Sequence, residues 1–427
     1  MVEKSQKNVT KVPSAQKIPA ADGKRLHAFT ALPSSSATIL GPRRAPAVKP
    51  PVGNNDKSIQ IFTSNGFQPL SNDVYTTAIK SLKPDIVVPL ADINYGAART
   101  PQAKSVRKMC ERTEEWMTEL NRSVELEELR ASNTSIFAPT LPAPYPMQWQ
   151  YLTCLSEELI SKISGLAVYD ADILPDLVNH PALTPLPRLS LDTPSGPHEV
   201  LRQISLGIDT FVLPFVNVVT DAGVAMTFRF PAAAAPADEA GLLPLGIDLT
   251  GPENTSSLQP LVEGCGCYAC THHHRAFVHH LLNAREMLAW VLLQVHNHHV
   301  VAEFFAGVRG SLAAAAAGAG AGAASEQQEQ QFEEDRRAFA RAYEAALPAG
   351  MGTRPRARGY HFKAEFGDGK RNEPAWGQLE GQDAGAKVQA VEDRLQRDLI
   401  ETPVVPDVDA AELAREGFAE MDIDKAK

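Results

Sequence analysis

Three of the five cysteines in this chain of 427 residues lie within six consecutive positions, in the stretch GCGCYACTHHH that starts at Gly264. Cys265, Cys267 and Cys270 form a C-x-C-x-x-C pattern, which allows three thiolates to converge on one ion from a single tight turn. Zinc prefers four tetrahedral nitrogen or sulfur ligands, so this pattern requires one more. Eight of the twelve histidines lie between positions 272 and 299, and His296 could return to the cysteines on the second of two packed helices.

The alternative is that the cysteines are buried small residues and the histidines are solvated helix faces. Three cysteines at this spacing beside so many histidines favour a metal, and the softness of the ligands favours zinc. A complete Cys3His set leaves no open position for water, so we expect a structural ion rather than a catalytic one. The other two cysteines, Cys110 and Cys154, have no spaced partner and are expected to be buried small side chains.

Charge and composition restrict the class of protein. The formal net charge is -10, yet residues 1–57 carry ten Lys and Arg against three Asp and Glu. Such a basic arm permits contact with a polyanion without establishing it. The odd number of cysteines and the lack of a secretory signal favour a reducing, intracellular compartment. Since no run of 18 apolar residues occurs, we expect a soluble protein with no integral membrane segment.

Short apolar or β-branched runs alternate with helical stretches from Ser58 onward. The runs lie at 59–62, 85–90, 135–139, 163–168, 208–216 and 224–230. Such alternation predicts a parallel sheet that is buried on both faces. The clearest helix is expected after Thr100-Pro101, with Val106, Met109 and Trp116 along one stripe.

Four regions are expected along the chain. A basic arm of low order covers 1–57, and a barrel over 58–310 includes a zinc subdomain over 262–309. An Ala/Gly-rich linker and a helix follow over 311–352, and the charged segment 353–427 is expected to be largely disordered.

The segment CGCYACTHHHRAFVHHLLNAREMLAWVLLQVHN resembles the zinc-binding segment of the tRNA-guanine transglycosylases, in which C-x-C-Y-x-C precedes RA-(Y/F)-(I/V)-HHL and a helix that ends in HN. Residue by residue, the resemblance implies that Cys265, Cys267, Cys270 and His296 bind one structural Zn²⁺. It also implies an α/β fold, a TIM-type (β/α)8 barrel with an inserted zinc-binding helical subdomain. The resemblance is weak before Pro84, so the first barrel strands are expected to be either divergent or absent.

Members of that family exchange a guanine at the wobble position of tRNA through a covalent ribosyl–enzyme intermediate. The chemistry needs one carboxylate as nucleophile and a second for proton transfer. The nucleophile segment G-(V/I)-D-x-F-D corresponds to GIDTFV at 207–212, where Asp209 matches the first aspartate and Val212 occupies the nucleophile position. The second carboxylate position falls on Ala91, with Asp92 one residue beyond it.

Two further parts of the family's active site are degraded. The base-binding Gly-Gly-Leu-Ala-(V/I)-Gly-Glu is reduced to SGLAVYD at 164–170, and residues 1–84 contain no equivalent of Asp-Ser-Gly-Gly-Phe-Gln. The combination resembles the non-catalytic accessory subunits of the eukaryotic queuine tRNA-ribosyltransferase, a heterodimer. This resemblance implies no catalytic residue in this chain, a catalytic subunit as partner, and contact with tRNA through the complex. It also implies a cytoplasmic location, including the periphery of the mitochondrial outer membrane.

Two alternatives stay open. One is an active transglycosylase that uses Asp92 and Asp209 in shifted roles, and the other is a zinc-stabilised scaffold with no role on tRNA. Asp209 is interpreted as a brace of a barrel turn, whereas Asp92 is either a loop carboxylate or a relic of the proton-transfer group. By the resemblance, the partner contacts residues around 262–309. The apolar residues available there are Phe277, Leu281, Leu282, Leu288, Trp290, Val291, Leu292, Phe304 and Phe305.

Overall fold

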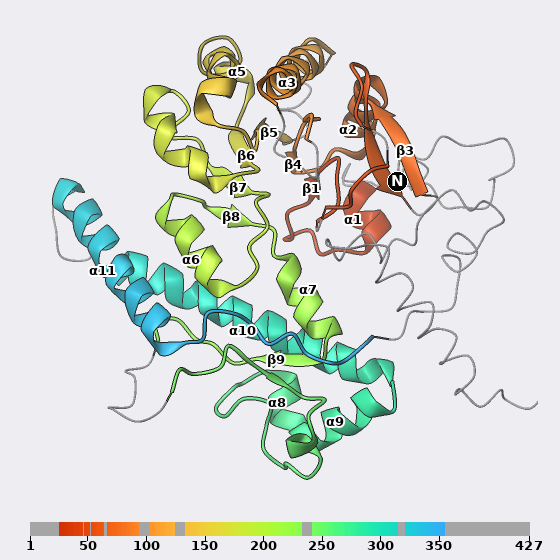
Figure 1. Ribbon diagram of the computed structural model, residues 1–427, viewed down its shortest axis with the longest axis vertical. Coiled ribbons are helices and arrows are strands. Elements are labelled where there is room, and N and C mark those ends of the chain that lie inside the picture. The colour runs from red at the N-terminus through yellow and green to blue at the C-terminus, as the bar shows by residue number, and fades with distance from the viewer. Residues whose placement is uncertain are drawn as a thin grey trace, which may run out of the picture. The chain divides into compact units, whose positions relative to one another are not determined.

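A parallel sheet of six strands in the order β1-β4-β5-β6-β7-β8 forms the first half of the computed structural model (Figure 1). Its strands are β1 (Ile39–Leu40), β4 (Ile86–Val87), β5 (Ser135–Thr140), β6 (Gly165–Val168), β7 (Arg188–Ser190) and β8 (Thr210–Phe211). The structure describes residues 25–45, 47–51, 53–63, 66–93, 102–123, 133–232, 241–314 and 321–354, with side chains left out at 314 and 321–329. All of these residues belong to one unit, Met1–Phe362.

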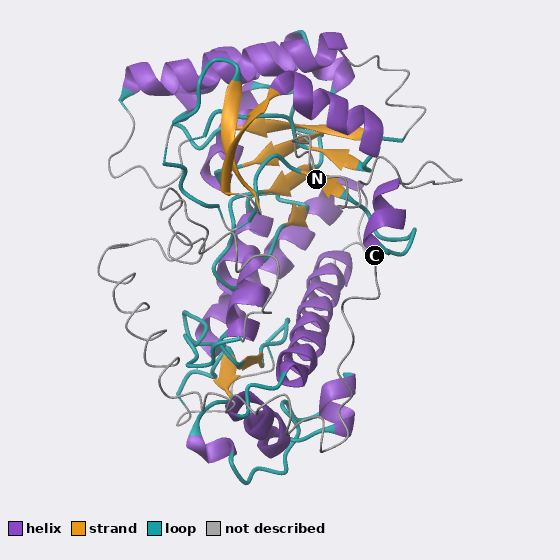
Figure 2. Ribbon diagram, turned by 90° about the vertical axis from the view of Figure 1, so that its right-hand side faces the viewer, coloured by secondary structure: helices purple, strands orange, loops and turns teal. Residues whose placement is uncertain are grey.

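Helices alternate with the strands of this sheet (Figure 2). They are α2 (Asn72–Leu82), α3 (Ala103–Ser123), α5 (Tyr145–Glu157), α6 (Pro197–Ser205) and α7 (Pro214–Asp221), with 3-10 helices η2 (Ile160–Lys162) and η3 (Ala171–Asn179). Ile136 and Leu166 of the sheet share one buried cluster with Trp116 of α3 and Leu152 of α5. The order of strands and the parallel pairing confirm the predicted α/β architecture for half of a barrel.

A second cluster lies on the opposite face of the sheet. Val88, Phe137, Ala167 and Leu189 are buried together, one from each of four successive strands or their ends, and Val212 packs against them. The ring of Phe137 lies directly over Gly165, where a Cβ atom would meet three ring carbons at 2.7–2.8 Å. This face of the sheet is therefore covered by apolar side chains of the chain itself, as in the layered interior of an α/β barrel.

The second half of the described chain contains a short antiparallel pair and a group of helices. The pair is β9 (Val224–Met226) with β10 (Gly246–Asp248). The helices are η4 (Pro252–Asn254), α8 (Tyr268–His272), α9 (Arg275–Asn283), α10 (Met287–Ala314) and α11 (Ala321–Ala342). An aromatic cluster of Phe228, Phe230, Phe304, Phe332 and Phe339 joins the segment after β9 to α10 and α11. Since Phe332 and Phe339 are buried, the helix that was expected within 311–352 belongs to the core.

Two runs that were expected in the parallel sheet lie elsewhere. The run at 59–62 belongs to β2 (Ser58–Thr63), which pairs antiparallel with β3 (Gly66–Ser71) along its whole length. The run at 224–230 starts as β9, which pairs with β10. The prediction was wrong for these runs because a short apolar run does not specify its pairing partner, and an antiparallel pair satisfies the same pattern.

The first strand of the sheet lies inside the segment that was expected to be an irregular arm. Within 1–57 the structure contains α1 (Arg25–Thr30) and β1, in which Ile39 pairs with Ile86. The Asp85 carboxylate accepts hydrogen bonds from the Thr38 amide and hydroxyl at 2.7 and 2.8 Å, which joins β1 to β4. The expectation of low order is therefore wrong for the described part of 25–57. The charged segment from 355 onward lies outside the described residues.

Helix α10 offers a matched pair of glycines. A Cβ atom at Gly307 would overlap the carbonyl oxygen of Phe230, whereas Gly310 has no heavy atom within 4 Å of such a position. Gly307→Ala is expected to lower the free energy of unfolding by about 1–3 kcal/mol through overpacking. Gly310→Ala is expected to raise it by about 0.5–1 kcal/mol through helix propensity. Thermal unfolding of both variants checks the prediction, and equal shifts of the same sign would contradict it.

Candidate metal centre

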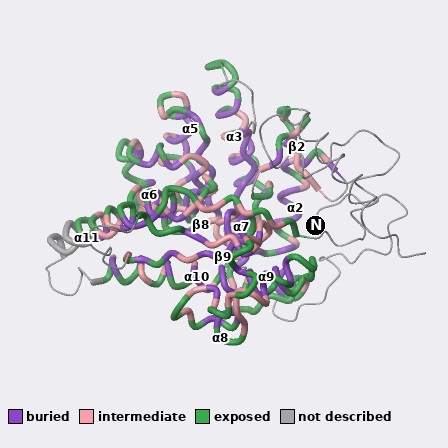
Figure 3. Tube along the Cα trace, turned by 60° about the horizontal axis from the view of Figure 1, so that its bottom comes forward, coloured by how far each residue is buried: buried purple, intermediate pink, exposed green. Residues whose placement is uncertain are grey.

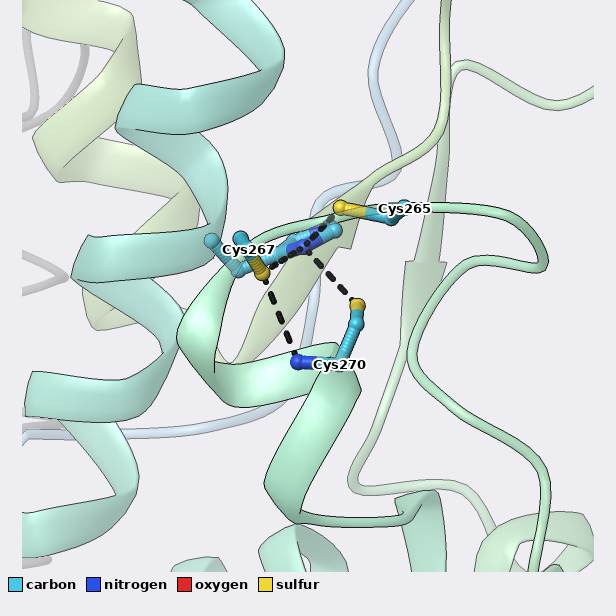
Figure 4. Close-up of side chains that lie close together, drawn as sticks. Cys265, Cys267 and Cys270 are labelled. Atoms are coloured by element: carbon cyan, nitrogen blue, oxygen red, sulfur yellow. Dashed lines mark hydrogen bonds between the residues drawn. The ribbon is translucent and has the colours of Figure 1, made fainter.

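Four side chains converge where α8 meets α10. Cys265 lies in the loop before α8, Cys267 and Cys270 lie at the start of α8, and His296 lies in α10. One ligand atom from each residue, three Sγ and one imidazole nitrogen, lies within 4.8 Å of all the others. Figure 4 shows the three cysteine side chains directed toward one point. Among the described residues, these four make the one such group of histidine, cysteine and acidic side chains.

The distances between the ligand atoms fit a tetrahedral ion. His296 Nδ1 lies 3.7 Å from Cys265 Sγ, 3.5 Å from Cys267 Sγ and 3.4 Å from Cys270 Sγ. Bonds of about 2.3 Å to sulfur and about 2.0–2.1 Å to nitrogen at tetrahedral angles would separate S and N by about 3.6 Å. The ligand set and its spacing therefore fit zinc as the resemblance implies.

The local backbone explains why the cysteines face one another. Cys267 is the N-cap residue of α8, and its Sγ accepts a hydrogen bond from the Cys270 amide at 3.4 Å. The preceding loop is fixed by Arg275, whose guanidinium donates to the carbonyls of Pro260 and Leu261 at 3.0 and 3.2 Å. Hydrogen bonds thus hold the start of α8 and the loop at 260–261 that leads to it.

The electrostatics of the three thiols favour a cation. Burial, together with the charges of the neighbouring thiolates, raises the pKa of Cys270 to about 12. At Cys267 burial acts in the same direction but is outweighed by hydrogen bonds, foremost from His296, which lower its pKa to about 6. One thiolate therefore forms readily, whereas a second beside it is disfavoured. A bound cation would remove that repulsion and allow all three to ionise.

A backbone carbonyl fixes the orientation of the histidine. His296 is fully buried, and its Nε2 lies 2.9 Å from the carbonyl oxygen of Met226 in β9. Because a carbonyl can only accept, Nε2 carries a proton, and Nδ1 would give up the proton that it shares with Cys267 and present its lone pair to a bound ion. Such outer contacts orient metal-binding histidines in general.

The other cysteines and histidines in the described part of the chain lie apart from this group. Cys110 and Cys154 are buried free thiols, as predicted, and burial raises the pKa of each to about 11. His279 is also buried and contacts the Leu249 carbonyl at 2.8 Å, so it has a structural partner. His272 and His298 are exposed, in agreement with the expected solvated faces.

Asp209 braces the start of β8. Its carboxylate accepts a hydrogen bond from the Arg188 amide at 2.8 Å, and its own amide donates to the Arg188 carbonyl at 3.0 Å. Asp209 immediately precedes β8, so it lies at the amino edge of the parallel sheet. Val212, which the resemblance aligns with the family's nucleophile, packs against the apolar cluster of Val88, Phe137, Ala167 and Leu189.

Asp92 lies beyond β4, at the carboxyl edge of the same sheet. Its side chain is 1% exposed and accepts hydrogen bonds from Arg112 Nη1 at 2.9 Å and from Asn54 Nδ2 at 2.7 Å. The two aspartates therefore lie at opposite edges of one parallel sheet. They cannot act together on one substrate.

Two acidic features were missed by sequence reasoning. Arg112 also binds Asp56 at 2.7 Å, and this hydrogen bond lowers the pKa of that exposed carboxyl. Asp56 precedes Arg112 by 56 positions, so no local pattern signals the pair. Asp192 follows β7, and half-burial raises its pKa. Its position directly after Leu189-Ser190-Leu191, at the end of a short strand, was the available signal.

Comparisons with known proteins agree with these observations. The family model described as Queuine tRNA-ribosyltransferase matches residues 6–320. A protein of Schizosaccharomyces pombe named queuine tRNA-ribosyltransferase accessory subunit 2 is 35% identical over 355 residues, which cover 82% of this chain and 74% of that protein. Proteins of the same name from Drosophila pseudoobscura pseudoobscura and Aedes aegypti are 30% and 26% identical, over 63% and 59% of this chain and 66% and 62% of their own lengths.

Proposed function

Because this chain belongs to the queuine tRNA-ribosyltransferase family, we propose that it is the non-catalytic subunit of a heterodimer that exchanges guanine for queuine at position 34 of tRNAs with GUN anticodons. The observation that carries this proposal is that Val212, which the resemblance places at the nucleophile position, packs against the apolar cluster of Val88, Phe137, Ala167 and Leu189. A valine side chain has no group that could attack the sugar carbon. Catalysis would therefore reside in the partner.

The positions of the two remaining candidate carboxylates support this reading over an active enzyme. Active sites of α/β barrels lie at the carboxyl edge of the strands. Asp209 lies at the other edge, and Asp92 is bound by Arg112 and Asn54 beneath the surface. An active transglycosylase that uses this pair would need to move one carboxylate across the sheet.

Within the proposed complex, the metal centre serves the fold. Cys265, Cys267, Cys270 and His296 would hold one Zn²⁺ per chain and leave no position for a substrate. The ion would cross-link the loop before α8 to α10, and through the Met226 carbonyl to β9. No step of the exchange reaction is assigned to it.

The proposed location is the cytoplasm, including the outer surface of mitochondria, as the resemblance implies.

An exposed apolar strip on α10 and α7 supports contact with a partner near the zinc subdomain. Leu288, Val291 and Val295 of α10 are 46%, 51% and 40% exposed, and Val218 of α7 is 58% exposed. A hydrogen bond of 3.0 Å from Gln294 to Asn217 joins the two helices between them. Figure 3 shows exposed and buried positions alternating along α10.

Most other apolar residues that were considered for this contact lie in the core. Those that are buried are Leu281, Leu282, Trp290, Leu292 and Phe304. Fewer apolar residues are therefore available for the proposed contact than the sequence suggested, and the contact is centred on the strip of α10 and α7.

A charge placed in this strip tests the contact. Val291→Asp is expected to weaken co-purification with a catalytic family member by about tenfold or more, since an unpaired carboxylate is costly to bury. Val178→Asp is the matched control, because Val178 is 73% exposed in η3 on the other half of the chain. Equal binding by both variants would place the partner elsewhere.

The proposed function is tested by transfer of labelled guanine or queuine into tRNA with a GUN anticodon. The chain is assayed alone and after co-expression with a catalytic family member, and that family member is also assayed alone. Transfer only in the co-purified complex supports the proposal. Transfer by this chain alone would contradict it, and transfer by the partner at an unchanged rate without this chain would favour a scaffold with no role on tRNA.

A further inference from the structure

We propose that Asn297 is a positioning residue of the metal centre, which acts through the backbone of Met226 to hold the imidazole of His296 in place. Asn297 directly follows His296 in α10 and is fully buried. Its described side-chain hydrogen bonds go to Met226, Val224 and Thr220 and to none of the four predicted ligands, so its effect on a metal would be indirect. The inference rests on the proposed binding of a metal by those ligands.

The two consecutive side chains bind both polar groups of one strand residue. The Met226 amide donates to Asn297 Oδ1 at 2.8 Å, and the Met226 carbonyl accepts from His296 Nε2 at 2.9 Å. Both contacts are buried, so the loss of either would leave an unsatisfied polar group in the interior. The position of the Met226 carbonyl, and with it the histidine ring, therefore depends on Asn297.

Among the described residues, one edge of β9 is not paired with a strand, which explains why both His296 and Asn297 bind its backbone. On its other edge β9 pairs with β10, and the Thr227 amide donates to the Leu245 carbonyl at 3.0 Å. Val224 and Met226, two positions apart, direct their backbone groups away from β10. Asn297 Nδ2 donates to the Val224 carbonyl at 2.9 Å, so His296 and Asn297 satisfy this edge as a neighbouring strand would.

A further hydrogen bond extends the arrangement to α7. Asn297 Nδ2 donates to Thr220 Oγ1 at 2.8 Å, and Thr220 is itself fully buried. The side-chain oxygen and nitrogen of Asn297 are thus both hydrogen-bonded, to β9 on one side and to α7 on the other. This bond does not involve Met226, so it allows the two roles of Asn297 to be separated.

The test compares zinc affinity by competition with a chromophoric chelator in the full chain. Asn297→Ala is expected to weaken zinc binding by about 10–100-fold, as is typical for loss of an outer partner of a metal-binding histidine. Thr220→Val removes one partner of Asn297 and leaves the Met226 bonds, so it is expected to change zinc affinity by less than about threefold. Unchanged affinity in Asn297→Ala, or equal weakening in both variants, would overturn the inference.

A measurement on the unmodified chain covers the case in which Asn297→Ala does not fold. Hydrogen exchange at the Met226 amide is followed with and without a chelator. The inference predicts strong protection that falls when the metal is removed, and protection that is independent of the metal would overturn it. If the unmodified chain binds no zinc at all, the proposed metal function fails, which is distinct from zinc binding that does not depend on Asn297.

Discussion

Replacing His296 with alanine is expected to abolish zinc binding and to destabilise the second half of the chain by several kcal/mol. Structural zinc sites contribute about 10–16 kcal/mol of binding free energy, and that energy is available to the fold. His296 also donates to the Met226 carbonyl, so its loss would remove a ligand and an anchor of β9 together. Metal content measured by atomic emission and thermal unfolding with and without a chelator check the prediction.

His298→Ala is the matched control for this variant. His298 lies two residues further along α10, is exposed, and contacts Gln294 at 2.6 Å. It should keep one zinc ion per chain and a nearly unchanged melting temperature. If His296→Ala retained the metal, or melted as His298→Ala does, the Cys3His site would be refuted.

Arg112→Met is expected to lower the free energy of unfolding by about 3–5 kcal/mol, because it leaves the Asp92 carboxylate buried without its charged partner. The Arg112 side chain is 16% exposed and binds both Asp92 and Asp56, so it joins α3 to the end of β4 and to the segment before β2. Met preserves most of the length and apolar contact of the arginine stem. Thermal unfolding measures the loss.

The double variant Arg112→Met with Asp92→Asn separates charge from packing. It should recover part of the lost stability, since no buried charge then remains unpaired. Arg107→Met in the exposed part of the same helix is the control and is expected to change stability by less than about 0.5 kcal/mol. A loss in Arg112→Met no larger than in the control would show that Asp92 is solvated rather than paired.

The metal centre was the most predictable part of the molecule because its signal is local. Three of its side chains lie within six positions, and only His296 must be brought to them by the packing of α10. The spacing left the fourth ligand open among several histidines and the resemblance implied His296; the structure brings the Cys270 sulfur and the His296 ring nitrogen to 3.4 Å. The identity of the ion remains a prediction from the ligand chemistry.

The parts that could not be predicted depend on contacts between distant segments. Strand β1 has two residues and no periodicity, so only its pairing with β4 identifies it. From the sequence, Asp92 could be either a loop carboxylate or a relic of the proton-transfer group. Its hydrogen bonds with Arg112 and Asn54 appear only in the fold. The edge of β9, which Asn297 satisfies from 71 positions away, has no sequence signal of its own.

The central claim is that the chemistry of the proposed heterodimer belongs to the partner, and it is tested most directly by the site of the covalent intermediate. The co-purified complex is mixed with labelled tRNA that carries a GUN anticodon, quenched with denaturant, and resolved by mass. The account predicts label on the catalytic subunit and none on this 46.2 kDa chain. Label on this chain would contradict the account, because it would show that this chain supplies a nucleophile of its own.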